Sequence, residues 1–126
     1  MAQEGCLMYI TDSLFPELQP EHRTRIYFGL GVAEDQVKIG LTGRKDGRRG
    51  GEMHFTELCA VPGDRRTEDF YHAKYTSDRI GKTEWFRLSD QLLIDLTVMC
   101  VQQGRSRSVE ILKKLTLTRL HSAAAA

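Results

Sequence analysis

The sequence lacks the features that mark membrane, secreted and disulfide-stapled proteins. No apolar run in its 126 residues approaches the roughly 20 residues that a membrane-spanning helix needs. The segment from Met1 to Cys6 contains the acid Glu4 and no basic residue, so we expect no secretory signal there. The cysteines are odd in number and too widely spaced for a paired-cysteine metal motif. We therefore expect a cytoplasmic protein in which Cys59 and Cys100 are core residues.

A large excess of positive charge is also missing. Eighteen basic residues against seventeen acidic ones give a formal net charge of +1. Dedicated DNA-binding domains usually carry a larger excess, so composition alone does not predict a nucleic-acid partner. Basic residues cluster locally instead, with four of them between Arg44 and Arg49 and a further pair at Arg65 and Arg66. These clusters are candidate phosphate contacts or ordinary solvated loops.

The length and composition predict one globular domain. The apolar fraction is 40% and the charged fraction 28%, both typical of a folded soluble chain. We interpret residues 1–24 as an N-terminal arm, 25–104 as the main domain and 105–122 as a C-terminal helical extension. The four alanines at 123–126 look like an expression-vector scar.

The first half of the domain has strand patterns. Residues 25–42 contain two strand-like segments joined by a short glycine-bearing turn, which predicts an antiparallel hairpin. Four glycines in residues 43–54 favour a loop that runs into a short or irregular helix. Residues 55–61 read as a third strand, closed by a Pro-Gly pair.

Helical patterns dominate the second half. Asp64 is expected to open a helix in which Glu68, Tyr71, His72 and Tyr75 share one face. After a short extended piece at 84–88, two apolar-rich helices follow, one capped by Ser89 and one beginning near Ser108. Their expected apolar positions are Leu92, Leu93, Leu96, Val98, Met99, Cys100, Val109, Ile111, Leu112, Leu115 and Leu117. The predicted fold class is therefore α+β, a small three-stranded antiparallel sheet flanked by helices, with extra C-terminal helices.

Five short features occur in a characteristic order. They are Ile26-Tyr27, Lys38-Ile39-Gly40, Arg48, Glu68 and Glu84-Trp85-Phe86, with 11 positions from Tyr27 to Lys38 and 10 from Lys38 to Arg48. This set resembles the GIY-YIG nuclease superfamily, in particular its phage-type branch with KIG in place of YIG. The resemblance covers about residues 25–90. It implies a GIY-YIG-like domain that hydrolyses DNA phosphodiester bonds with one Mg²⁺ or Mn²⁺ ion.

The resemblance also implies roles for individual residues. Glu68 would be the metal ligand, and Arg48 would contact the scissile phosphate, with Arg44 and Arg49 as alternatives for that contact. His72 lies one turn after Glu68, where it could orient a water molecule or a metal ligand.

The activated water needs a base, and Tyr27 or Lys38 would supply it. The two residues would face the same side of the hairpin, and either would need a lowered pKa for this role. Ordinary structural readings stand beside these roles: Tyr27 as a packed strand aromatic, Lys38 as a solvated strand residue, and Glu68 as an acid favoured by the helix dipole. Glu84 fits the pattern without an assigned role.

Two other functions fit the same residues. A non-catalytic nucleic-acid-binding module on this fold would account for the near-neutral charge, with RNA as an alternative to DNA. A protein-interaction domain is the third hypothesis, with the C-terminal helices forming a homodimer seam. We expect Trp85 and Phe86 to be core residues in each case.

Overall fold

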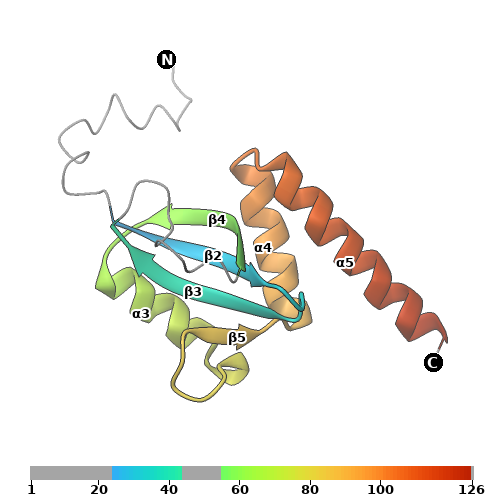
Figure 1. Ribbon diagram of the computed structural model, residues 1–126, viewed down its shortest axis with the longest axis horizontal. Coiled ribbons are helices and arrows are strands. Elements are labelled where there is room, and N and C mark those ends of the chain that lie inside the picture. The colour runs from blue at the N-terminus through green and yellow to red at the C-terminus, as the bar shows by residue number, and fades with distance from the viewer. Residues whose placement is uncertain (1–23, 44–54, 126) are drawn as a thin grey trace.

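The computed structural model describes residues 24–43 and 55–125 (Figure 1). Its strands form a four-stranded antiparallel sheet in the order β4-β2-β3-β5. They are β2 (Arg25–Gly31), β3 (Gln36–Thr42), β4 (Phe55–Pro62) and β5 (Trp85–Arg87). The helices are α3 (Arg65–Lys74), the 3-10 turn η1 (Thr76–Asp78), α4 (Asp90–Gln102) and α5 (Ser106–Ala125). The mixed α+β class is confirmed.

The predicted hairpin is present as β2 and β3. Tyr27 pairs with Gly40, and Gly29 pairs with Lys38, so Tyr27 and Lys38 lie on the same face of the sheet as expected. The residues that alternate with Tyr27 and Lys38 along the two strands turn to the other face of the sheet. Four of them are fully buried there: Ile26, Phe28, Val37 and Ile39.

The sheet has one strand more than predicted. The short extended piece expected at 84–88 pairs with the first half of β3, so three of its residues form an edge strand of the sheet. Phe86 is fully buried in the core. Trp85 is half-buried on the opposite face, where its ring lies beside Gly31. The expectation of a core position was therefore right for Phe86 and wrong for Trp85, because neighbouring strand residues point to opposite faces.

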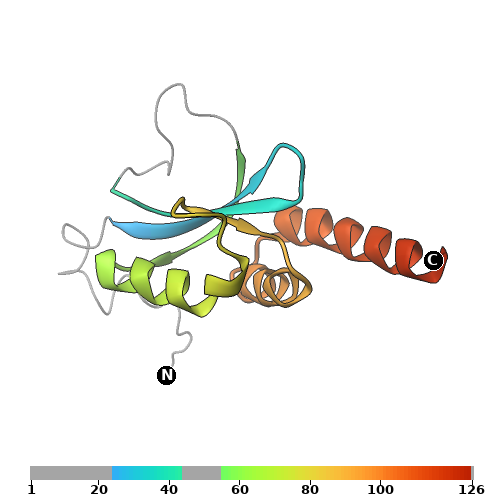
Figure 2. The ribbon, with the colours of Figure 1, turned by 90° about the horizontal axis from the view of Figure 1, so that it is seen from below.

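Helices α3 and α4 cover one face of the sheet (Figure 2). Their apolar side chains and the inward strand residues form a single core. Asp64 caps α3 as predicted, and Ser89 caps α4 by accepting a hydrogen bond from the Leu92 N–H at 3.2 Å. The opposite face of the sheet carries Tyr27 and Lys38.

The C-terminal extension is packed onto the domain. Helix α5 begins at Ser106, slightly before the predicted start, and continues through Ala125. The Ser108 hydroxyl donates a 2.7 Å hydrogen bond to the Leu58 carbonyl on β4, and Leu112 is fully buried. Val98 and Leu117, both expected as apolar helix positions, are each 49% exposed, so they contribute little to the core.

The prediction that Cys59 and Cys100 are core residues is confirmed. Cys59 and Cys100 are buried free thiols, and Cys6 lies outside the described residues. Their side chains lie within hydrogen-bonding reach, and this contact and burial raise the pKa of Cys59. Among the helices described here, none combines the length and the apolar character needed to cross a membrane.

Candidate active site

Helix α3 begins in a way that fixes the direction of Glu68. The Asp64 carboxylate accepts hydrogen bonds from the N–H groups of Arg66 and Thr67 at 3.0 and 3.4 Å. The Thr67 hydroxyl in turn accepts one from the Asp64 N–H at 3.3 Å. This reciprocal cap locks the first turn. Glu68, which lies in that turn, therefore points toward the sheet rather than toward solvent.

Strand β3 leaves part of its outer edge open to α3. Strand β5 pairs with β3 only up to Lys38, and the last edge bond runs from the Ile39 N–H to the Glu84 carbonyl at 2.9 Å. Beyond that point, side chains of α3 replace the missing strand. The His72 Nε2 lies 2.9 Å from the Ile39 carbonyl oxygen, and the Glu68 carboxylate accepts a hydrogen bond from the Leu41 N–H. Side chains of α3 therefore satisfy the hydrogen-bonding groups of this part of the strand edge.

Glu68 is the most deeply buried acid among the described residues, at 7% exposure. Burial and the neighbouring Glu84 carboxylate raise its pKa, and the nearby His72 opposes that rise. Its oxygens lie 3.8 Å from the Arg65 Nε and 4.0 Å from the His72 Nε2. The two carboxyl groups of Glu68 and Glu84 are within hydrogen-bonding reach of each other. The proximity of this second carboxyl therefore adds to the effect of burial on the pKa of Glu68.

Gly40 holds these groups close together. An added Cβ at Gly40 would lie 2.7 Å from the Tyr27 hydroxyl and 3.0 Å from the Glu84 Oε1. Both atoms therefore rest against the bare backbone of β3. Tyr27 is 4% exposed, and its ring stacks on Phe55 with centroids 5.2 Å apart and planes 7° apart. The structure brings a phenol, two carboxyls and the His72 imidazole to one stretch of β3.

Lys38 lies on the same face as Tyr27, two residues before Gly40 along β3. Its Nζ sits 5.5 Å from the centroid of the Phe55 ring, a cation–π arrangement that leaves the ammonium half-exposed. The structure therefore places Lys38 beside Tyr27 and Phe55, and not against the two acids.

The arginines expected to contact phosphate, Arg44, Arg48 and Arg49, lie outside the described residues. The expected metal ligand Glu68 is described, and its neighbour Glu84 is the site residue to which no role was assigned. Its sequence signal was its position at the head of Glu84-Trp85-Phe86. Within residues 24–43 and 55–125, no three His, Cys, Asp or Glu side chains lie close enough together to hold a metal ion as a group.

His72 has a fixed hydrogen-bonding role. Its Nε2 faces the Ile39 carbonyl, which is an acceptor only, so Nε2 carries the proton. The ring also packs at 5.2 Å from Phe86. His72 can therefore hold Glu68 and β3 in place, whereas its Nε2 is not free to bind a metal.

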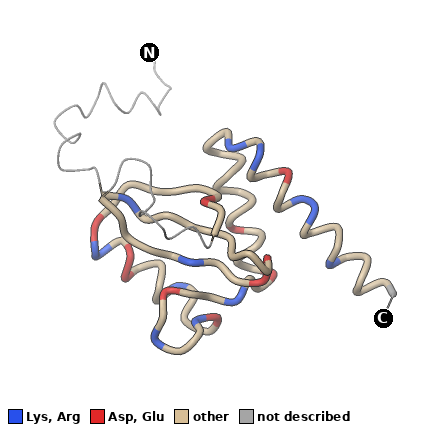
Figure 3. The backbone as a smooth tube through the Cα atoms, viewed as in Figure 1, with Lys and Arg blue, Asp and Glu red and all other residues tan. Residues whose placement is uncertain are grey.

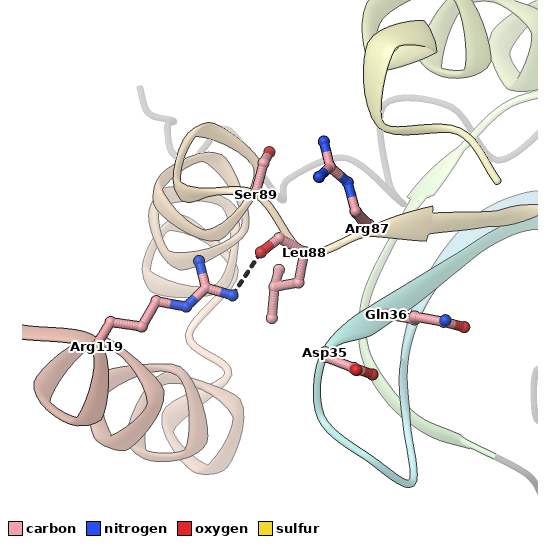
Figure 4. A pocket seen from close by; sticks show the side chains of 6 residues that line it. All are labelled: Asp35, Gln36, Arg87, Leu88, Ser89 and Arg119. Atoms are coloured by element: carbon pink, nitrogen blue, oxygen red, sulfur yellow. Dashed lines mark hydrogen bonds between the residues drawn. The ribbon is translucent and has the colours of Figure 1, made fainter. Parts of the chain in front are cut away.

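A pocket of about 320 Å³ lies away from this site, between β5, α4 and α5 (Figure 4). Its arginines are already paired. Arg87 lies 3.3 Å from Asp78, and Arg119 lies 2.8 Å from Asp90 while it also donates to the Leu88 carbonyl. Through Arg119, the contacts at this pocket hold the second half of α5 against the start of α4.

Comparisons with known proteins add no relative to this description. A scan against protein-family models, a search of curated proteins and a search of solved structures each found no match.

Proposed function

We propose that the protein is a metal-dependent endonuclease of the GIY-YIG type, acting on DNA. The observation that carries the proposal is that Tyr27 and Glu84 meet at the bare backbone of Gly40, while Glu68 meets Glu84 and the N–H of the next residue, Leu41. Three segments far apart in the sequence meet there. The order of the elements supports the same reading, since a hairpin is followed by a helix that bears an acid and by a short strand headed by a second acid.

The two carboxyl groups fit a divalent cation. Glu68 is nearly buried and faces a second acid, so a neutralising charge between them would remove a repulsion that otherwise requires a shared proton. Mg²⁺ prefers carboxylate oxygen and water ligands and is commonly held by one or two carboxylates. Glu68 and Glu84 would hold it. When bound, such an ion supplies charge relief at the phosphate and help for the leaving oxygen.

The other residues of the site have complementary tasks under this proposal. The Tyr27 hydroxyl, held beside Glu84, is placed to orient the attacking water and to pass its proton to a carboxylate. The Lys38 ammonium attracts the nucleic-acid phosphate to the same face. His72 holds Glu68 against the edge of β3. Arg48 keeps its proposed role as the residue that stabilises the phosphate.

The direct test is a plasmid-nicking assay with Mg²⁺ or Mn²⁺. We expect cleavage by the wild-type chain and losses on the order of 100-fold or more in Glu68→Gln and Glu84→Gln, as for removal of a transition-state stabilising group. Tyr27→Phe keeps the ring on Phe55 and should lose about 10- to 100-fold. Asp69→Asn is the matched control, because Asp69 is the exposed neighbour of Glu68 on α3.

Two results would overturn the proposal. Wild-type binding of DNA with no cleavage under either metal would favour the non-catalytic binding module on the same fold. Cleavage by Glu68→Gln at the rate of Asp69→Asn would show that the two acids are not the site.

A further inference from the structure

Positive charge is concentrated in the last helix. Residues 105–125 contain five of the eighteen basic residues and one of the seventeen acidic ones. Because the whole chain carries a net charge of only +1, the remainder of the chain is net negative. Figure 3 shows the basic positions spaced along α5, interrupted by a single acid. The segment 105–125 therefore carries a net positive charge, whereas the rest of the chain taken together does not.

The basic side chains occupy the outer side of α5. Ser108 and Leu112 are buried against the domain, and Arg119 is held by Asp90. At about 100° per residue, Arg107, Glu110, Lys113 and Lys114 fall within an arc of roughly 120° on the opposite side. All four are exposed. The cations of this arc are free to meet a partner in solution.

A pocket adjoins the start of the same helix. It has a volume of about 320 Å³ and lies between the beginning of β4 and the beginning of α5. Its lining residues are Thr56, Glu57, Arg105, Ser106, Arg107, Ser108 and Ile111. In the described part of the chain, neither Arg105 nor Arg107 forms an ion pair or a side-chain hydrogen bond, unlike Arg87 and Arg119.

We infer that Arg107, Lys113 and Lys114, named here the α5 cationic face, bind the phosphate backbone of the nucleic acid that the candidate active site cuts. The inference rests on the proposed function for the identity of that partner. Three exposed cations on one side of a helix, the first of them beside a pocket, complement a polyanion with regularly spaced charges. This surface would add phosphate contacts to those proposed for Lys38 and Arg48 at the cleavage site.

The position of this face suits a contact outside the cleavage site. Thr56 lies on β4 opposite Leu30, which is three residues from the Tyr27–Gly40 pair on the neighbouring strands. Standard strand spacing and rise then separate the pocket from Gly40 by about 14 Å along the sheet. This distance corresponds to about four base pairs of duplex DNA.

A lipid surface is the less suitable partner. Membrane-surface helices bury an apolar face beside their basic one. The inward side of α5 is already used, since Leu112 is fully buried in the domain. The exposed Leu117 and Leu120 lie beyond Lys114, the last residue of the α5 cationic face, toward the end of the helix. The phosphate backbone of a nucleic acid therefore matches the α5 cationic face better.

The test measures binding without cleavage. A fluorescently labelled DNA duplex is titrated with the full chain in EDTA, at salt concentrations from about 50 to 200 mM, and anisotropy gives Kd. The Lys113→Gln/Lys114→Gln variant should bind on the order of 10-fold more weakly at low salt. Its log–log salt slope should be smaller in magnitude by about 1.8, from about 0.9 for each lost phosphate contact. The control is Lys74→Gln/Lys82→Gln, which removes the same charge from exposed positions outside α5.

A variant with the opposite expected sign completes the test. Glu110→Gln removes the one acid of the arc, so it should tighten binding several-fold, a gain that misfolding cannot imitate. Equal losses in the two double-lysine variants, an unchanged affinity in Glu110→Gln, or binding to anionic vesicles but not to DNA would each overturn the inference. Because the assay contains no metal, a chain that binds through α5 and never cuts would overturn only the nuclease proposal.

Discussion

The hydroxyl of Tyr27 lies against the backbone of Gly40, so closely that a Cβ on that glycine would approach the oxygen to 2.7 Å. The same Cβ would lie 3.0 Å from the Glu84 Oε1. The missing side chain of Gly40 therefore leaves the space that the Tyr27 hydroxyl and the Glu84 carboxylate occupy. The glycine of the Lys38-Ile39-Gly40 motif thus has a physical reason that does not depend on an unusual backbone angle.

Replacing Gly40 by alanine should displace both groups. We expect Gly40→Ala to lose nicking activity by about 100-fold, because sub-ångström misplacement of reacting groups is costly. Gly43→Ala is the matched control at the same end of the strand, since the nearest atom of the described residues, on Thr24, is 3.8 Å from its added Cβ. Nicking assays and thermal melts of both variants give the comparison. Equal activity in the two would contradict the assigned role of Gly40.

Divalent cations should stabilise the folded chain through Glu68 and Glu84. A ligand that binds only the folded state adds about 2.7 kcal/mol at 100 times its Kd. We therefore expect Mn²⁺ and Mg²⁺ to raise the Tm of the wild type and of Asp69→Asn. The same ions should leave the Tm of Glu68→Gln and Glu84→Gln unchanged. A shift of equal size in all four proteins would place the cation elsewhere.

The raised pKa of Glu68 makes stability depend on pH. Because burial and Glu84 favour the protonated acid in the folded state, that state binds the proton more tightly than the unfolded chain does. This contribution is fully present below the ordinary glutamic acid pKa and is lost as the pH rises through the raised value. Urea unfolding across the acid to neutral range, without metal, measures the effect.

Two variants separate the causes of that pH dependence. Glu68→Gln should remove this component and should be more stable than the wild type at neutral pH. Glu84→Gln should reduce the component but keep the part that is due to burial. An unfolding free energy that varies with pH identically in the wild type and in Glu68→Gln would show that the raised pKa does not contribute.

Helix α5 should be part of the folding unit rather than an appendage. Leu112→Ala removes a fully buried side chain and should cost about 2–5 kcal/mol of unfolding free energy. Leu117→Ala, one and a half turns later on the same helix, changes a side chain that is 49% exposed and should cost less than about 1 kcal/mol. Chemical denaturation of the two variants measures the difference, and near-equal costs would mean that α5 does not pack as described.

Local patterns in the sequence determined much of this protein. Alternation of apolar and polar residues predicted the two strands of the β2–β3 hairpin, because a strand repeats every two residues, and the observed register then placed Tyr27 on the face of Lys38. The i, i+3, i+4, i+7 spacing put Glu68 and His72 on the inward side of α3, because a helix repeats every 3.6 residues. The capping residues Asp64 and Ser89 were also readable, since their bonds are made within three positions.

Only the tertiary structure decided that Glu84 joins Glu68. That meeting requires β5 to pair with β3 across more than 40 positions of sequence, and no local rule sets which strands become neighbours. The same limit explains why Val98 and Leu117 are half-exposed. Their helical spacing predicts an apolar side of the helix, but it does not predict whether another element covers that side. Periodicity fixes the direction of a side chain relative to its own element, whereas proximity between elements follows from the packing of the whole chain.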